Sequence, residues 1–173
     1  AIECSRNLMT FVREAWPILE PKTPFVSAYH LDVIADHLQA VSSGDLQHLL
    51  INIPPRMAKS LMGNVFWPSW EWLTQPNQRY LCATYARDLT MRDSVKMRRL
   101  LEHPGGAVEG TIFQRLGYQG VLRLIPGATQ WELTGDQNVK GRYDNTATGY
   151  RLATSVGAQA TGEGGDRIVI DDP

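Results

Sequence analysis

Residues 49–60 read Leu-Leu-Ile-Asn-Ile-Pro-Pro-Arg-Met-Ala-Lys-Ser, and this stretch decides the fold class of the chain. The apolar run at residues 48–53 predicts a buried β-strand. Two prolines then end the strand, and a helical stretch is expected over residues 59–73, with a kink or a break at Pro68. A strand that enters a helix through a tight loop gathers backbone N–H groups and the positive end of a helix dipole at one place. The local sequence therefore predicts an anion site.

The Lys-Ser pair that ends this loop matches part of the phosphate-binding loop pattern, G-x-x-x-x-G-K-[ST]. The lysine of that pattern contributes a charge at the β- and γ-phosphates of a nucleotide, and the hydroxyl can ligate Mg²⁺. The two glycine positions hold Ile53 and Ala58 here, so Lys59 and Ser60 are the strict matches. Because a Cβ penalises a positive φ, the loop accommodates Ala58 if it keeps φ negative there. Taken alone, the motif leaves a chance Lys-Ser pair as an open alternative.

A second apolar run, Arg-Ile-Val-Ile-Asp-Asp at residues 167–172, predicts a buried strand that ends in two acids. In nucleotide-hydrolysing enzymes one such acid serves Mg²⁺ and the next polarises the attacking water. The long separation between Lys59 and Asp171 leaves room for the strand and helix of such a core plus an insertion. An acidic cap before a turn is the alternative for Asp171 and Asp172. Both motifs together, in this order and each at a strand end, favour a nucleotide site.

The segments between these motifs predict an α/β protein. A strand is expected over residues 79–85, a helix over 86–102, and a β-rich insertion over 107–165. The short β-type pieces of the insertion lie at residues 121–125, 129–133 and 149–155. Alternating strands and helices favour a parallel sheet flanked by helices, as in a P-loop NTPase core of the ASCE or RecA-like type, with the β-rich insertion before the last strand.

The N-terminal region predicts helices and no further motif. We expect a helix over residues 5–15 that stops before Pro17, and an amphipathic helix over 28–42. The chain divides into an N-terminal helix with a proline-rich lead-in, residues 1–24, and a partial ATPase domain, residues 25–173. The sequence lacks an initiator Met and stops directly after the acidic strand end, so we expect a truncated piece of a longer protein.

The charge balance gives no global attraction to nucleic acid. Lys and Arg number 17, Asp and Glu 18, and the net charge is −1, so a nucleic-acid site must be a local patch. Arg92, Lys96 and Arg99 share one face of the predicted helix and are candidates, with a solvated helix face as the alternative. No apolar run approaches 18 residues and no signal peptide is recognised, so neither a membrane span nor secretion is predicted.

Three stretches together resemble a known family. They are LLINIPPRMAKSL, YLCATYARDLTMRDSVKMRRLLEHP and DQNVKGRYDNTATGYRLATSVGAQATGEGGDRIVIDDP. Over about residues 25–173 the sequence is similar to the N-terminal ATPase region of the large subunit of tailed-phage terminases, the DNA-packaging motors. The resemblance implies Mg²⁺-dependent ATP hydrolysis that drives double-stranded DNA into a procapsid. It also implies the portal and the small terminase subunit as partners, a ring oligomer when full length, and the cytoplasm of a bacterial host.

The resemblance carries over to individual residues. It implies that Lys59 and Ser60 hold phosphate and Mg²⁺, that Asp171 serves the Mg²⁺, and that Asp172 stands at the position of the catalytic carboxylate. Arg56 would sense or stabilise the γ-phosphate, with a surface loop cation as the alternative. The predicted catalytic residues are thus Asp172, Arg56 and Lys59; the predicted nucleotide-binding residues Pro55, Arg56, Met57, Ala58, Lys59, Ser60, Leu61, Tyr29 and His30; and the predicted metal ligands Ser60 and Asp171.

Several alternatives stay open at this point. Tyr29 could stack on the adenine and His30 could bond to it, but both also fit the start of a helix at the core edge. Terminases of this kind carry a coupling motif and a nuclease domain further on, so the nuclease is expected to be absent from this chain. Another P-loop ATPase such as a helicase-like translocase, an inactive nucleotide-binding fragment, and a nuclease-type metal site at Asp171 and Asp172 are the competing hypotheses.

Overall fold

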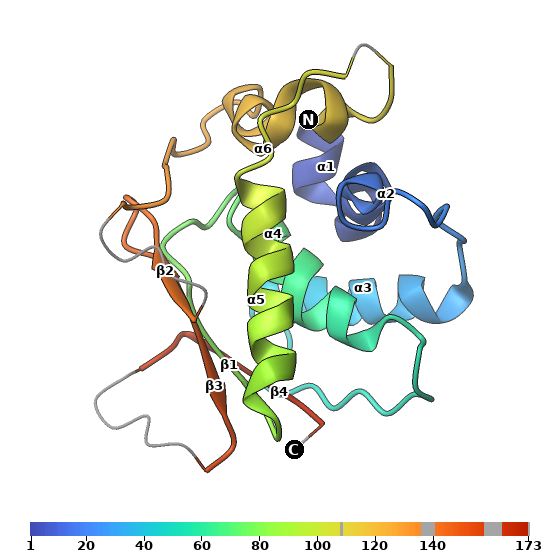
Figure 1. Ribbon diagram of the computed structural model, residues 1–173, viewed down its shortest axis with the longest axis vertical. Helices are drawn as coiled ribbons and strands as arrows, with labels where there is room; N and C mark the ends of the chain where they lie inside the picture. The colour runs from blue at the N-terminus through green and yellow to red at the C-terminus, as the bar shows by residue number, and fades with distance from the viewer. Residues whose placement is uncertain (108, 136–140, 158–163, 173) are drawn as a thin grey trace.

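The computed structural model describes residues 1–107, 109–135, 141–157 and 164–172 of the 173-residue chain. Residues 108, 136–140 and 158–163 of the predicted β-rich insertion lie outside the described residues. The fold is α/β, with the described strands in one mixed sheet and the helices packed against it (Figure 1). The elements are α1 (Ile2–Arg6), α2 (Leu8–Leu19), α3 (Tyr29–Ser43), the π-helix η1 (Leu61–Phe66), α4 (Trp67–Glu71), β1 (Arg79–Thr84), α5 (Arg87–Leu101), α6 (Ile112–Arg123), β2 (Arg142–Asp144), β3 (Tyr150–Ser155) and β4 (Arg167–Asp171).

The sheet has the strand order β2-β3-β1-β4. Strand β1 pairs in parallel with both β3 and β4, so that Cys82 lies opposite Ala153 on one side and Val169 on the other. Strand β2 is antiparallel to β3, so the prediction of an all-parallel sheet is wrong at this edge. The prediction that β3 belongs to an insertion is also wrong, because β3 is a central strand of the sheet. Its alternate residues Arg151 and Ala153 are buried, and the strand is hydrogen-bonded to β1 on one side and to β2 on the other.

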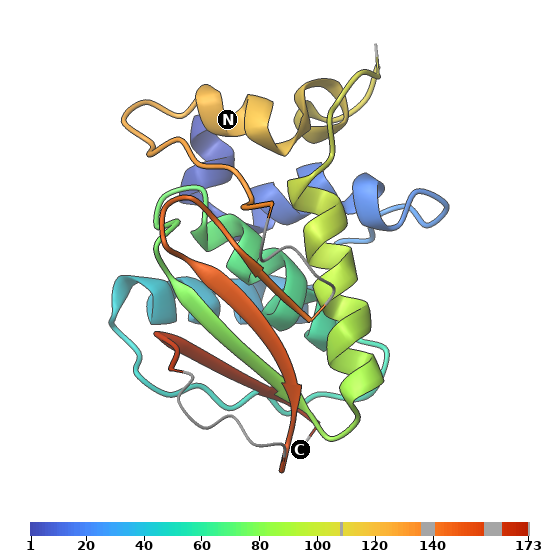
Figure 2. The same ribbon diagram turned by 60° about the vertical axis from the view of Figure 1, so that its left-hand side comes forward.

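The predicted strand at residues 48–53 is not part of the sheet. The segment is extended and shows strand-like alternation, with Leu49 and Ile51 packed against the core and Leu50 exposed. No ladder to a described strand forms, and Pro54 and Pro55, which follow at once, have no N–H groups to donate. In both ribbon views the segment passes close to the end of β4, so it still delivers the loop after it to that strand end (Figures 1 and 2).

Two helix predictions also need correction. Helix α2 continues through Pro17 to Leu19, because the apolar residues of its last turn, Ile18 and Leu19, are buried in the core. The predicted β-type piece at residues 121–125 instead begins in the last turn of α6, a helix that Thr111 starts with a capping box. By contrast, β1, α5 and β4 match the predicted segments to within two residues at each end.

The helices cover one face of the sheet and build the core there. Phe11 of α2 makes edge-to-face contacts with Phe66 of η1 and Phe113 of α6, at centroid distances of 6.5 and 5.0 Å. On the opposite face Ile168 and Ile170 are 64% and 57% exposed. Figure 2 shows this face towards the viewer with the helices behind it. Among the described helices none has the length and apolar character needed to cross a membrane.

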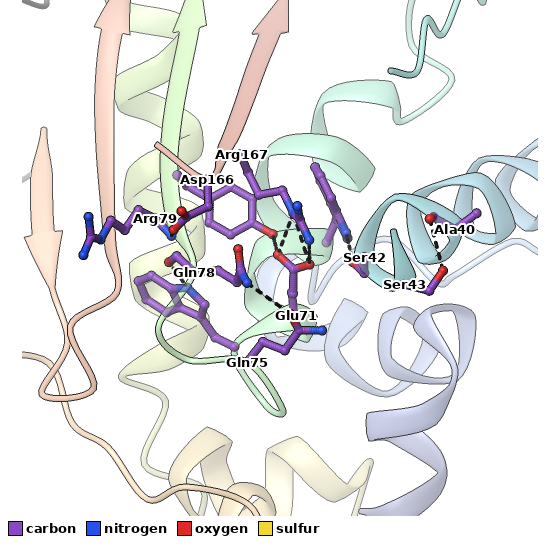
Figure 3. Close-up of polar contacts among 12 residues, drawn as sticks. Ala40, Ser42, Ser43, Glu71, Gln75, Gln78, Arg79, Asp166 and Arg167 are labelled. Atoms are coloured by element: carbon purple, nitrogen blue, oxygen red, sulfur yellow. Dashed lines mark hydrogen bonds and ion pairs between the residues drawn. The ribbon is translucent and has the colours of Figure 1, made fainter. Parts of the chain in front are cut away.

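A buried polar group ties β4 to the helical layer (Figure 3). Glu71, at the end of α4, is almost fully buried and accepts hydrogen bonds from the Tyr80 hydroxyl and from the Arg167 guanidinium, whose Nη2 lies 2.9 Å from Oε1. We call Glu71, Tyr80 and Arg167 the Glu71 network. Both carboxylate oxygens of Glu71 are engaged, so its charge is balanced inside the protein.

Candidate functional site

A pocket of about 410 Å³ lies where the loop before η1 meets the end of β4. The loop and the strand end supply most of its walls, and η1, β1 and α5 supply the rest. The lining residues are Ile53, Pro54, Pro55, Arg56, Ala58, Lys59, Ser60, Leu61, Thr84, Leu89, Arg92, Asp171 and Asp172. Most of the predicted loop residues and both predicted acids therefore meet at one cavity.

The ammonium group of Lys59 lies between the two acids. Its Nζ is 2.5 Å from Asp172 Oδ1 and 3.1 Å from Asp171 Oδ1. The hydrogen bond to Asp172, only partly opposed by burial and reinforced by Asp171, raises the pKa of Lys59 above its ordinary value. Lys59 therefore carries a positive charge at the pocket. In this arrangement the two acids, rather than a ligand, balance that charge.

The loop backbone is strained at two non-glycine positions. Arg56 has φ +66° and Ala58 has φ +59°, both in the left-handed region. The sequence predicted that Ala58 fits the loop if its φ is negative, and its φ is positive. For an L-residue this region costs about 1–2 kcal/mol, which is why glycine usually occupies such positions. Asp172 also has a positive φ, +48°, so strained backbone lies on both sides of the Lys59 ammonium.

The loop keeps hydrogen-bonding capacity free for a ligand. In the described ranges no acceptor is paired with the backbone N–H groups of residues 56–60, and Ser60 makes no side-chain capping bond. Helix η1 begins directly after Ser60, so these donors lie at its positive end. Unpaired loop N–H groups, a lysine, a serine hydroxyl and a carboxylate at one pocket are a set of groups that fits a phosphate chain with Mg²⁺.

Beside the pocket lies a row of buried polar side chains, of which the sequence predicted only Asp171 as a residue of this site. Asn64 of η1 donates from Nδ2 to Asp171 Oδ2 at 3.2 Å, and Arg151 of β3 donates from Nη1 to the Asn64 carbonyl at 2.6 Å. Asp93 of α5 is buried close enough to interact electrostatically with Arg151, and burial raises the pKa of Asp93 while Arg92 partly opposes the shift. We call Asp171, Asn64, Arg151 and Asp93 the Asp171 row. No motif or spacing marks Asn64 or Arg151 as site residues, because their contact joins η1 to β3, which lie far apart in the sequence.

Three predicted binding residues do not line the pocket. Tyr29 is 85% exposed at the start of α3, and His30 follows it there. Met57 belongs to the loop but is 42% exposed and absent from the pocket wall. The loop turns Met57 outward because its neighbours Arg56 and Ala58 both adopt left-handed backbone. An adenine contact by Tyr29 or His30 has no support in this arrangement.

The three basic residues of α5 separate into different environments. Arg92 lines the pocket, while its Nε donates to Asp93 Oδ1 at 3.0 Å. Lys96 pairs with Glu20 of the N-terminal region at 2.6 Å, and Arg99 is exposed. The predicted basic stripe is therefore not one uniform surface, and Arg92 belongs with the pocket.

The described residues do not supply the ligands of a nuclease-type metal cluster. Within the part of the chain that the structure describes, no three His, Cys, Asp or Glu side chains gather at a point. A nucleotide-bound Mg²⁺ needs only one or two protein ligands, because phosphates and water complete its shell. Comparison of the chain with protein-family models, with curated proteins and with solved structures found no match.

Proposed function

We propose that this chain binds Mg²⁺-ATP in the pocket beside Lys59 and hydrolyses it, as the motor ATPase region of a viral terminase large subunit. The observation that carries the proposal is the position of Lys59, within 3.1 Å of two acids that end a strand more than a hundred residues further along. A loop lysine and a strand-end acidic pair at one cavity are what phosphoryl transfer from a nucleotide requires.

Each pocket residue has a role in this proposal. The Lys59 ammonium leaves the two acids and binds the β- and γ-phosphates, while the free loop N–H groups hold the phosphate chain. Ser60 and Asp171 would hold a Mg²⁺ ion, which would neutralise charge on the phosphates. Asp172, whose side chain is 66% exposed, orients a water molecule and takes up its proton. Arg56 approaches the γ-phosphate from the loop.

The packaging role rests on the resemblance in sequence rather than on the pocket. The same resemblance proposes double-stranded DNA, the portal and the small terminase subunit as partners, a ring of full-length subunits, and a bacterial host cytoplasm. The pocket itself suits a helicase-like translocase equally well. Stimulation of ATP hydrolysis by double-stranded but not single-stranded DNA would favour the terminase role.

The test is nucleotide binding by calorimetry, with and without Mg²⁺, for the wild type, Lys59→Ala and Lys22→Ala. We expect Lys59→Ala to weaken Mg²⁺-ADP binding by about tenfold to a hundredfold, because a charge-assisted bond contributes about 1.5–3 kcal/mol. Lys22 is exposed and does not line the pocket, so its variant should bind as the wild type does. Equal binding by Lys59→Ala and the wild type would exclude this pocket as a nucleotide site. No binding by the wild type would leave the inactive fragment as the better description.

A further inference from the structure

Asn64 holds one half of the Asp171 carboxylate. Its side-chain amide donates to Asp171 Oδ2 at 3.2 Å, while Lys59 lies 3.1 Å from Oδ1. Asn64 is 1% exposed and stands on η1, four residues after Ser60. When Lys59 turns to a phosphate, the amide of Asn64 is the contact that stays on Asp171.

Asn64 is itself held by an unusual backbone contact. In an α-helix its carbonyl would accept from the N–H four residues on, but that residue is Pro68, which has no N–H. The backbone forms a π-helix at this point, in which the N–H of Trp67 donates to the carbonyl of Met62. The Asn64 carbonyl, which Pro68 cannot reach with an N–H, accepts from Arg151 Nη1 at 2.6 Å. Because Arg151 is fully buried in the central strand β3, it fixes Asn64 to the sheet.

The row is incompletely satisfied, unlike an ordinary structural cluster. Asn64 Oδ1, Asp93 Oδ2 and both Nε and Nη2 of Arg151 have no hydrogen-bond partner among the described residues. Each unpaired buried polar atom costs about 1–3 kcal/mol, so a row retained only for stability would be expected to pair them. A π-turn next to a binding loop is also typical of functional sites.

We propose that Asn64 is a positioning residue that orients Asp171 for Mg²⁺ in the nucleotide complex, and that Arg151 holds Asn64 for this task. The inference rests on the proposed function. It assigns to Asn64 no contact with nucleotide or metal: the amide keeps Oδ2 turned inward, so that Oδ1 faces the pocket. Loss of the amide should therefore weaken the response to Mg²⁺ and leave metal-free nucleotide binding unchanged.

The experiment measures ADP affinity by calorimetry, in Mg²⁺ and in EDTA, for the wild type, Asn64→Leu and Ser69→Ala. Asn64→Leu keeps a similar volume without the donor, and its Mg²⁺-dependent gain in affinity should fall about tenfold, as when an outer-shell partner of a metal ligand is removed. Its affinity in EDTA should equal that of the wild type. Ser69 is a buried hydroxyl of α4 that bonds to the Val65 carbonyl and not to Asp171, so Ser69→Ala should keep the full Mg²⁺ gain.

The outcomes are separable. A folded Asn64→Leu with the wild-type Mg²⁺ gain, or with equal losses in Mg²⁺ and EDTA, overturns the positioning role while the proposed function stands. Absence of ADP binding by the wild type overturns the proposed function and this inference with it. If circular dichroism shows that Asn64→Leu does not fold, Asn64→Ser, which is too short to reach Oδ2, undergoes the same test with the same two criteria.

Discussion

The Glu71 network and the Asp171 row are both buried polar groups between the sheet and the helices, but they differ in how completely their polar atoms are hydrogen-bonded. In the Glu71 network both carboxylate oxygens are engaged by Tyr80 and Arg167. In the Asp171 row, Asn64 and Arg151 carry side-chain atoms without partners among the described residues. The backbone differs too, because Arg56, Ala58 and Asp172, three of the four described non-glycine residues with a positive φ, line the same pocket as Asp171.

The difference separates what stabilises the fold from what the site needs. Buried polar groups that serve only stability are normally paired, because each unpaired atom opposes folding. Unpaired donors and left-handed backbone persist where a ligand, rather than the protein, completes the arrangement. On this view the Glu71 network should matter for unfolding, and the Asp171 row and its loop should matter for binding.

The largest effect is expected from Glu71→Ala. Removal of the carboxylate leaves the Arg167 guanidinium and the Tyr80 hydroxyl without their acceptor, and breaking a buried ion pair in this way costs about 3–5 kcal/mol. The free energy of unfolding, measured by urea denaturation with circular dichroism, should fall by that amount. Mg²⁺-ADP affinity, measured where the variant is still folded, should not change.

A surface pair gives the matched control for that measurement. Glu102 pairs with Arg98 one helical turn away at 3.0 Å, and both side chains are partly exposed. Glu102→Ala should therefore lower the unfolding free energy by only about 0.3–0.5 kcal/mol. A loss below 1 kcal/mol for Glu71→Ala would show that the Glu71 network does not stabilise the fold. The proposed division between a stabilising network and a binding row would then be wrong for the network.

The sequence predicted individual elements better than their arrangement. Apolar runs and caps located β1, α5 and β4, because those signals are local. The pairing partner of a strand is a long-range property, so β3 was assigned to an insertion although it is hydrogen-bonded to β1. The segment at residues 48–53 shows the converse error: its apolar alternation is strand-like, but its backbone remains outside the sheet.

The site was predictable to the extent that it follows motifs. Lys59, Asp171 and Asp172 were chosen from two short patterns, and their side chains meet at one pocket. Asn64 and Arg151 were missed because their contacts depend on how η1 packs on β3, which no spacing along the chain reveals.

A smaller effect is expected from Ala58→Gly. Glycine removes the Cβ that opposes φ +59°, and the relief outweighs the added freedom of the unfolded chain, for a net gain of about 0.5–1 kcal/mol. Urea denaturation should show this stabilisation. In Ala40→Gly, within helix α3, the same exchange should instead cost about 1 kcal/mol. A loss for Ala58→Gly would mean that the left-handed loop is not the conformation of the free protein.

The smallest effect is expected from Arg92→Gln. This variant tests whether the part of the pocket wall that α5 supplies contributes to nucleotide binding. Arg92 lines the pocket but its side chain is 54% exposed, so its attraction for phosphate is screened by solvent. Glutamine keeps an N–H donor for Asp93 and removes the charge. Mg²⁺-ADP affinity at low salt should therefore fall about threefold, and the difference from the wild type should shrink as salt is added.

Arg99→Gln, on the same helix and away from the pocket, should bind as the wild type does. Equal changes in the two variants would assign the effect to the net charge of the helix, and the wall of α5 would then lie outside the site.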